Sequence, residues 1–158
     1  MYAVNTYDGT CNIVSGKISY KNSLKSDGIY DIHLINTIQL TDFNDGLQIF
    51  SLTMKDSVIL FDGVEHHGRN IYFYNLDTME QGKYESEIWD TRDPILFDKG
   101  FLKSDDKYGV FNLYVSTDEK DGFLTNVQGG AFMPDISLKG DIAFSLYDNG
   151  KYKVAILS

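Results

Sequence analysis

The chain has 158 residues, of which 23 are acidic and 14 basic, so its formal net charge at pH 7 is −9. Without a basic stripe to neutralise phosphates, this composition argues against nucleic acids and anionic membranes as partners. The single cysteine excludes an intrachain disulfide, and no apolar run is long enough to span a bilayer or act as a secretory signal. We therefore expect a cytoplasmic protein with one domain over residues 1–158.

The N-terminal segment is predicted to form a β-hairpin. A two-residue turn at Asp8-Gly9 sets Val4 opposite Ile13 and keeps polar and apolar side chains on consistent faces. The next strand is expected within residues 29–40, where apolar and polar side chains alternate.

Asn36 is the one polar residue on the apolar face of that strand, so it marks a bend or a bulge. Short strands with alternating or apolar patterns are also predicted at 47–55, 57–62, 70–76, 84–90, 94–98, 108–116, 122–128 and 136–139. About ten short strands in all predict an all-β, single-domain antiparallel β-sandwich of the jelly-roll or Greek-key type, or a flattened β-barrel. Recurring YDG, FDG and YDNG pieces are interpreted as turns and not as a repeat of fixed period.

The C-terminal segment DIAFSLYDNGKYKVAIL is predicted to be a second hairpin. A three-residue loop, Asp148 to Gly150, would pair Phe144 with Val154 and leave one face wholly apolar. A two-residue loop would set apolar and charged residues on the same face. The pattern therefore favours the three-residue loop, with a left-handed Gly150 in a type I turn plus bulge.

Aromatic residues near acidic ones are the positive functional signal. Tyr72 and Tyr74 share one face of the strand NIYFYN, and Trp89 follows two glutamates in YESEIWD. Rings on an outward face would suit a sugar ring or a protein partner. In the alternative interpretation these strands are covered on both faces, as the apolar run SVILF also indicates.

The segment VEHHGRN, residues 64–70, is predicted to be a solvated hairpin loop. Its adjacent histidines, His66 and His67, stand beside Glu65, but a zinc site needs three or four ligands. The third histidine, His33, is expected to face outward on a different strand. The acidic segments 42–46 and 118–122 are interpreted as Asx-type turns in preference to calcium loops. We accordingly assign no catalytic residue, no metal and no cofactor.

No nucleophile elbow, phosphate-binding loop or dinucleotide fingerprint occurs in the sequence. The hypothesis that follows is a non-catalytic protein that binds a protein or glycan through an acidic, aromatic-bearing surface. In one version it is an acidic inhibitor or immunity-type protein that masks a basic target, since opposite charges speed association. Two alternatives stay open: a calycin-like barrel that holds a small apolar ligand, and a metal-dependent enzyme that uses the His66-His67 loop.

Overall fold

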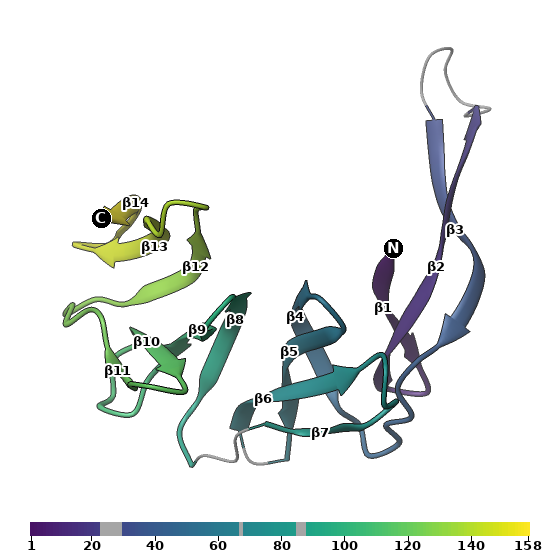
Figure 1. Ribbon diagram of the computed structural model, residues 1–158, viewed down its shortest axis with the longest axis horizontal. Helices are drawn as coiled ribbons and strands as arrows, with labels where there is room; N and C mark the ends of the chain where they lie inside the picture. The colour runs from purple at the N-terminus through teal and green to yellow at the C-terminus, as the bar shows by residue number, and fades with distance from the viewer. Residues whose placement is uncertain (23–29, 67, 85–87) are drawn as a thin grey trace. The chain divides into compact units, whose positions relative to one another are not determined.

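The computed structural model of the chain describes residues 1–22, 30–66, 68–84 and 88–158. These residues form fourteen strands, paired antiparallel in four separate sheets (Figure 1). The prediction of an antiparallel all-β protein is confirmed, with more strands than the ten expected. The flattened barrel is not what the described strands form, because the four sheets stay open. None of the described residues lies in a helix long and apolar enough to cross a membrane.

The described chain divides into two compact units, residues 1–47 and 48–158. That residues 1–158 form one domain stays a prediction. The first unit carries the first sheet: β1 (Tyr2–Tyr7), β2 (Thr10–Asn22) and β3 (Tyr30–Gln39). Its hairpin has the predicted register, with Val4 opposite Ile13. The bulge expected at Asn36 is also present, because the β2–β3 register shifts there and Asn36 has a φ of 52°.

The second unit carries the other three sheets, in each of which every strand pairs with its neighbour in sequence. The second sheet consists of β4 (Gln48–Lys55), β5 (Val58–Glu65), β6 (Gly68–Asn75) and β7 (Gln81–Lys83). The third consists of β8 (Thr91–Phe97), β9 (Gly100–Asp105), β10 (Asn112–Thr117) and β11 (Gly122–Phe123). The fourth consists of β12 (Ala131–Ile136), β13 (Ile142–Asp148) and β14 (Lys151–Leu157).

Three strand predictions were wrong. The strand β9 was not expected, and the strand expected at 84–90 is replaced by β7, three residues earlier. Part of that predicted strand, residues 85–87, lies outside the described residues, and its described part is not strand. The strand expected at 136–139 is replaced by β12, which ends at Ile136.

Within the second unit the sheets stack in chain order, face on face. Strand β8 packs against β4, β5 and β6, and β12 packs against β8, β9 and β10. Each junction has its own apolar core. Leu60 and Ile71 of the second sheet meet Phe101, while Leu102 and Leu113 of the third sheet meet Phe144. The third sheet is therefore covered by apolar side chains on both faces.

The C-terminal hairpin has the register that the sequence pattern disfavoured. Asp148 pairs with Lys151, so the loop holds two residues, and Leu146 lies opposite Lys153. The charged Lys153 is tolerated on the apolar face because its stem is long enough to carry the ammonium out to Asp148, 2.6 Å away. The hydrogen bond and charge of Lys153 lower the pKa of Asp148 below its ordinary value. The predicted three-residue loop is therefore wrong.

The two loop residues explain why this register is stable. Asn149 and Gly150 have φ values of 50° and 76°, the left-handed pair of a type I′ turn. Gly150→Val should lower the free energy of unfolding by more than about 1 kcal/mol, because a β-branched residue resists positive φ. No atom lies within 4 Å of the added Cβ, so the loss comes from the backbone alone. Urea denaturation should also show that Gly150→Asn is tolerated; equal stabilities of the valine and asparagine variants would contradict the turn.

A buried charge network joins the three sheets of the second unit. Asp62, fully buried, accepts hydrogen bonds from the amide and hydroxyl of Ser51 and from Nε of Arg69. The Arg69 guanidinium lies 3.9 Å from Oδ1 of Asp93, and Oδ2 of Asp93 accepts the amide of Met133 at 3.1 Å. The network thus runs from β4 and β5 through β6 and β8 to β12.

Candidate functional site

An open groove of about 690 Å³ lies on the third sheet and the segment that follows it. Its apolar side is formed by Tyr108, Phe123 and Leu124, and its polar side includes Asn112, Asn126 and Gln128. Tyr108 is 76% exposed and Leu124 is 40% exposed, so both have surface to offer a ligand. We call this feature the Tyr108–Phe123 groove.

Ring packing holds the apolar side of the groove in place. The Phe123 ring lies between Tyr108, at 5.4 Å between centroids, and Tyr114, at 5.0 Å in an edge-to-face arrangement. Tyr114 and Phe123 are direct partners across β10 and β11, which brings their rings together on one face. The cluster is therefore built by strand pairing and not by a loose loop.

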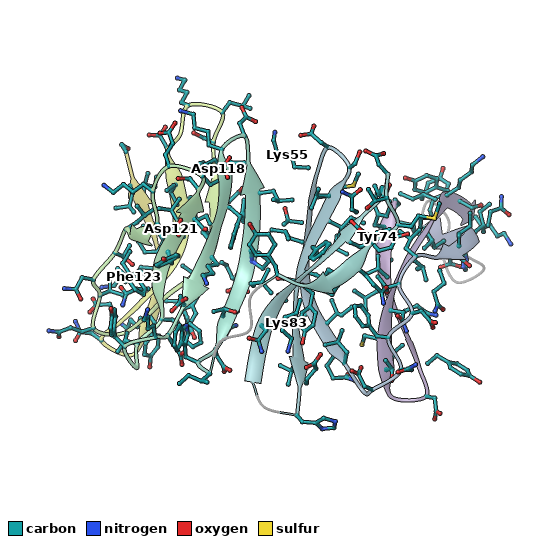
Figure 2. The ribbon with its side chains drawn as sticks, turned by 60° about the horizontal axis from the view of Figure 1, so that its bottom comes forward. Lys55, Tyr74, Lys83, Asp118, Asp121 and Phe123 are labelled. Atoms are coloured by element: carbon teal, nitrogen blue, oxygen red, sulfur yellow. The ribbon has the colours of Figure 1, made fainter. Side chains whose placement is uncertain are left out.

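The turn before Phe123 is closed by its own side chains. Oδ1 of Asp121 accepts the amide of Thr117 at 3.0 Å, and the Thr117 hydroxyl donates to the carbonyl of Lys120. These bonds agree with the turn predicted for 118–122. Figure 2 labels Asp118, Asp121 and Phe123, which this turn and β11 carry together. The acidic residues of this turn thus precede Phe123 in the chain, and Asp118 and Glu119 line a separate hollow with Lys99.

The polar side of the groove is fixed by Asn112. Its Oδ1 accepts the hydroxyl of Thr125 at 2.9 Å and the amide of Val127 at 2.8 Å. The Thr125 hydroxyl also accepts the amide of Leu113 at 2.9 Å. Because these bonds join β10 to the segment 124–128, the groove is preorganised, which lowers the entropic cost of binding.

Trp89, one of the three predicted partner-binding residues, lies in a charged cluster near this groove. Its Nε1 donates to Oδ2 of Asp105 at 3.3 Å, and Nζ of Lys107 lies 4.9 Å from its ring centroid. Asp105 also pairs with Lys103 at 3.1 Å, and Lys103 lies 5.1 Å from the Tyr114 ring centroid. Trp89 is thereby linked through Asp105 and Lys103 to the aromatic side of the groove.

The other two predicted residues, Tyr72 and Tyr74, are buried, with exposed fractions of 2% and 6%. Tyr72 stacks on Phe61 at 5.6 Å, and Lys83 lies 5.3 Å from its ring centroid. The structure thus agrees with the alternative in which this strand is covered on both faces. Partner binding by these tyrosines stays a prediction that their burial does not support.

The histidine segment has the hairpin geometry that was expected. Glu65 pairs with Gly68 across β5 and β6, and His66 is exposed at the turn, while His67 lies outside the described residues. Burial raises the pKa of Glu65, but the hydrogen bond and charge of Lys83, 2.9 Å away, help to hold the pKa below its ordinary value. A carboxylate with a lowered pKa is a poor general base. Among the described residues no three His, Cys, Asp or Glu side chains come together to hold a metal.

Asp106 is the acidic residue next to the Trp89 cluster whose pKa is raised. Burial is the main cause, and the charges of Asp90 and Asp105 add to it. Because the folded pKa exceeds the unfolded one, ionisation of Asp106 disfavours the folded state as pH rises through the interval between them. Its carboxylate still accepts the Asp90 amide at 2.8 Å, a bond that asparagine can keep.

Asp106→Asn should therefore stabilise the protein at neutral pH. The gain should be small below the ordinary aspartate pKa, grow across that interval, and level off above the raised pKa. Urea denaturation of both proteins at a series of pH values measures it. If the difference in stability between the two proteins does not change with pH, ionisation of Asp106 does not disfavour the folded state.

Sequence reasoning missed most of the groove. It singled out Trp89 but not Tyr108 or Phe123, which it placed only within the strands expected at 108–116 and 122–128. The available signal was the pair Tyr114 and Phe123 flanking an Asx-type turn, which predicts two rings side by side across a hairpin.

No protein-family model and no curated protein matches this chain. Among solved structures, the crystal structure of TolB from Acinetobacter baumannii is similar, with a TM-score of 0.70 at 19% sequence identity. The match covers 98% of this chain and 37% of the TolB chain, so this chain spans little more than a third of that protein's length. The likeness shows a shared β-rich fold.

Proposed function

We propose that this chain is a non-catalytic binding protein whose Tyr108–Phe123 groove takes an apolar or aromatic segment of a partner protein. The observation that carries the proposal is the exposed Tyr108 ring above a preorganised, partly apolar groove. Exposed tyrosines supply large contact area at low entropic cost, which makes them frequent hot spots of interfaces. Trp89, the remaining predicted binding residue, lies at the neighbouring cluster.

Charge supports a basic partner. The chain carries a net charge of −9, and Asp118, Glu119 and Asp121 stand on the turn that leads to Phe123. Lysine or arginine residues flanking the apolar segment of the partner would be attracted to this side of the groove. This is the form of the proposal in which the chain masks a basic surface, as an acidic inhibitor or immunity-type protein does.

A glycan is the second candidate ligand. The groove sets the Tyr108 ring beside the amide side chains of Asn126 and Gln128, and a ring with convergent polar groups suits a sugar. The two candidates differ in salt dependence, since binding of a basic peptide should weaken with added salt and binding of a neutral glycan should not.

Selection from a displayed random-peptide library, beside a neutral-glycan array, tests the proposal. We expect basic peptides with an aromatic or apolar centre to be enriched. Isothermal titration with an enriched peptide should then show Tyr108→Ala weakening affinity about 10- to 100-fold, the range of a hot-spot truncation. Tyr20→Ala is the matched control, because Tyr20 is 63% exposed on the first sheet, away from the groove residues in sequence and sheet. Equal affinities of wild type and Tyr108→Ala would contradict the proposal.

A further inference from the structure

The first three strands of the third sheet and the three strands of the fourth sheet pair in the same register. In the third sheet Arg92, Ser104 and Leu113 lie in one row across three strands. In the fourth sheet Phe132, Ser145 and Val154 form the corresponding row.

The first strand of each sheet, β8 or β12, then bulges at a residue of positive φ that precedes a proline: Asp93 before Pro94, and Met133 before Pro134. After the bulge the next row is Ile95, Leu102 and Val115 in the third sheet. The next row in the fourth sheet is Asp135, Ala143 and Ile156. Leu113 therefore corresponds to Val154, and Val115 to Ile156.

These corresponding residues have opposite exposures. Leu113 is fully buried and Val115 packs beside it, because the fourth sheet covers this face of the third. Val154 is 82% exposed and Ile156 is 66% exposed. The fourth sheet thus has a face equivalent to the one on which the third sheet is covered by its neighbour, but in the fourth sheet this face is exposed. We call it the bare face.

The bare face is apolar and nearly free of charge. Alternation along the strands places Phe132, Ala143, Ser145, Tyr147, Tyr152, Val154 and Ile156 on it. The one acidic residue in these rows is Asp135, at the end of β12. Lys151 and Lys153 point to the other face, since Lys153 is paired with the inward Leu146.

A hollow of about 400 Å³ opens on the same face. It is lined by Phe132, Met133, Ser145 and Tyr152 of the fourth sheet, by Arg92 of the third sheet, and by Phe111, which directly precedes β10. The Arg92 guanidinium lies 5.3 Å from the ring centroids of both Phe111 and Phe132. It also pairs with Asp93, so its charge is already compensated within the chain. The hollow can accept an apolar side chain of whatever covers the face.

We infer that the bare face of the fourth sheet binds a second copy of this chain, with the fourth sheets of two copies stacked on each other about a two-fold axis. A stacked antiparallel sheet is what covers the corresponding face of the third sheet, which makes a sheet the fitting occupant. Two chains of charge −9 repel each other, and this nearly uncharged face is where a copy can approach at least electrostatic cost. A two-fold contact that uses the same patch on both chains closes on itself.

Sedimentation equilibrium at micromolar to submillimolar concentrations tests this inference. The wild type should pass from the 17.9 kDa monomer to a dimer with rising concentration. Val154→Lys combined with Ile156→Lys should stay monomeric, because it places like charges opposite each other in the contact. Ile88→Lys is the control, since Ile88 is 95% exposed outside this face, and it should dimerise like the wild type. A wild type that stays monomeric throughout, or a double variant that dimerises equally, would overturn the inference.

Hydrogen exchange of the wild type gives an independent readout if the double variant does not fold. Protection of the amides in β14 should increase between dilute and concentrated samples, while protection in β10 should stay constant. A β14 exchange rate that is the same at both concentrations would overturn the dimer without any substitution.

Discussion

Phe144→Ala should lower the free energy of unfolding by about 3–5 kcal/mol, the usual cost of truncating a buried phenylalanine. Phe144 is 6% exposed and packs with Leu102, Leu113 and Ala131 at the junction of the third and fourth sheets. Removing its ring would leave a cavity between the two sheets. Urea denaturation followed by circular dichroism measures the loss.

Val154→Ala is the matched control for that experiment. The sequence pattern paired Val154 with Phe144 on a common apolar face, whereas in the structure Val154 is 82% exposed on the opposite face. Measured on dilute, monomeric protein, the substitution should change stability by less than about 0.5 kcal/mol, as is usual at the surface. A loss of several kcal/mol from Val154→Ala, comparable to that from Phe144→Ala, would contradict the two-residue loop, because it would place both side chains on the buried face.

Asp62→Ala is the second substitution with a large expected effect, a loss of about 3–5 kcal/mol. It removes the acceptor of the Arg69 and Ser51 bonds and leaves an inward-facing guanidinium whose remaining ion pair, to Asp93, is long at 3.9 Å. The penalty of a buried, unmatched charge exceeds the worth of the lost bonds themselves. Urea denaturation again measures it.

The double variant Asp62→Leu with Arg69→Met is the control, because it removes both charges and keeps apolar volume. It should recover much of the stability lost in Asp62→Ala, since replacing both partners avoids the unmatched charge. If the double variant were less stable than Asp62→Ala, the stability lost in Asp62→Ala would come from the missing hydrogen bonds and not from the unmatched charge.

Local rules predicted the N-terminal hairpin correctly and the C-terminal hairpin incorrectly, for the same physical reason. In both, the structure follows the chemistry of a two-residue turn, Asp8-Gly9 or Asn149-Gly150, with both residues at positive φ. At the C-terminus the alternation of apolar and polar residues predicted the wrong register, because Val154 and Ile156 are apolar yet exposed. The assumption that apolar residues face inward fails on a sheet that leaves one apolar face bare.

Strand β9 was not predicted, because its polar residues are typical of a loop. Lys103 and Asp105 are both 2% exposed, and they pair with each other inside the third sheet. A sequence pattern treats lysine and aspartate as solvated, and only the fold shows that they compensate each other in the interior.

A repeat was also present and was missed. The chain's two prolines, Pro94 and Pro134, lie 40 residues apart, and each follows the positive-φ residue of a bulge. That spacing is typical of repeated four-stranded sheets. The interpretation of YDG and FDG pieces as unrelated turns drew attention away from the prolines, which mark the corresponding strands β8 and β12.

The central claim, that a partner binds in the Tyr108–Phe123 groove, is tested most directly by a hydrogen-exchange footprint. A peptide enriched by the displayed library is added to the wild type, and amide protection is compared along the chain. The account predicts new protection confined to the segments around 106–112 and 122–128, absent in Tyr108→Ala at the same peptide concentration. Protection elsewhere, with these two segments unchanged, would contradict it.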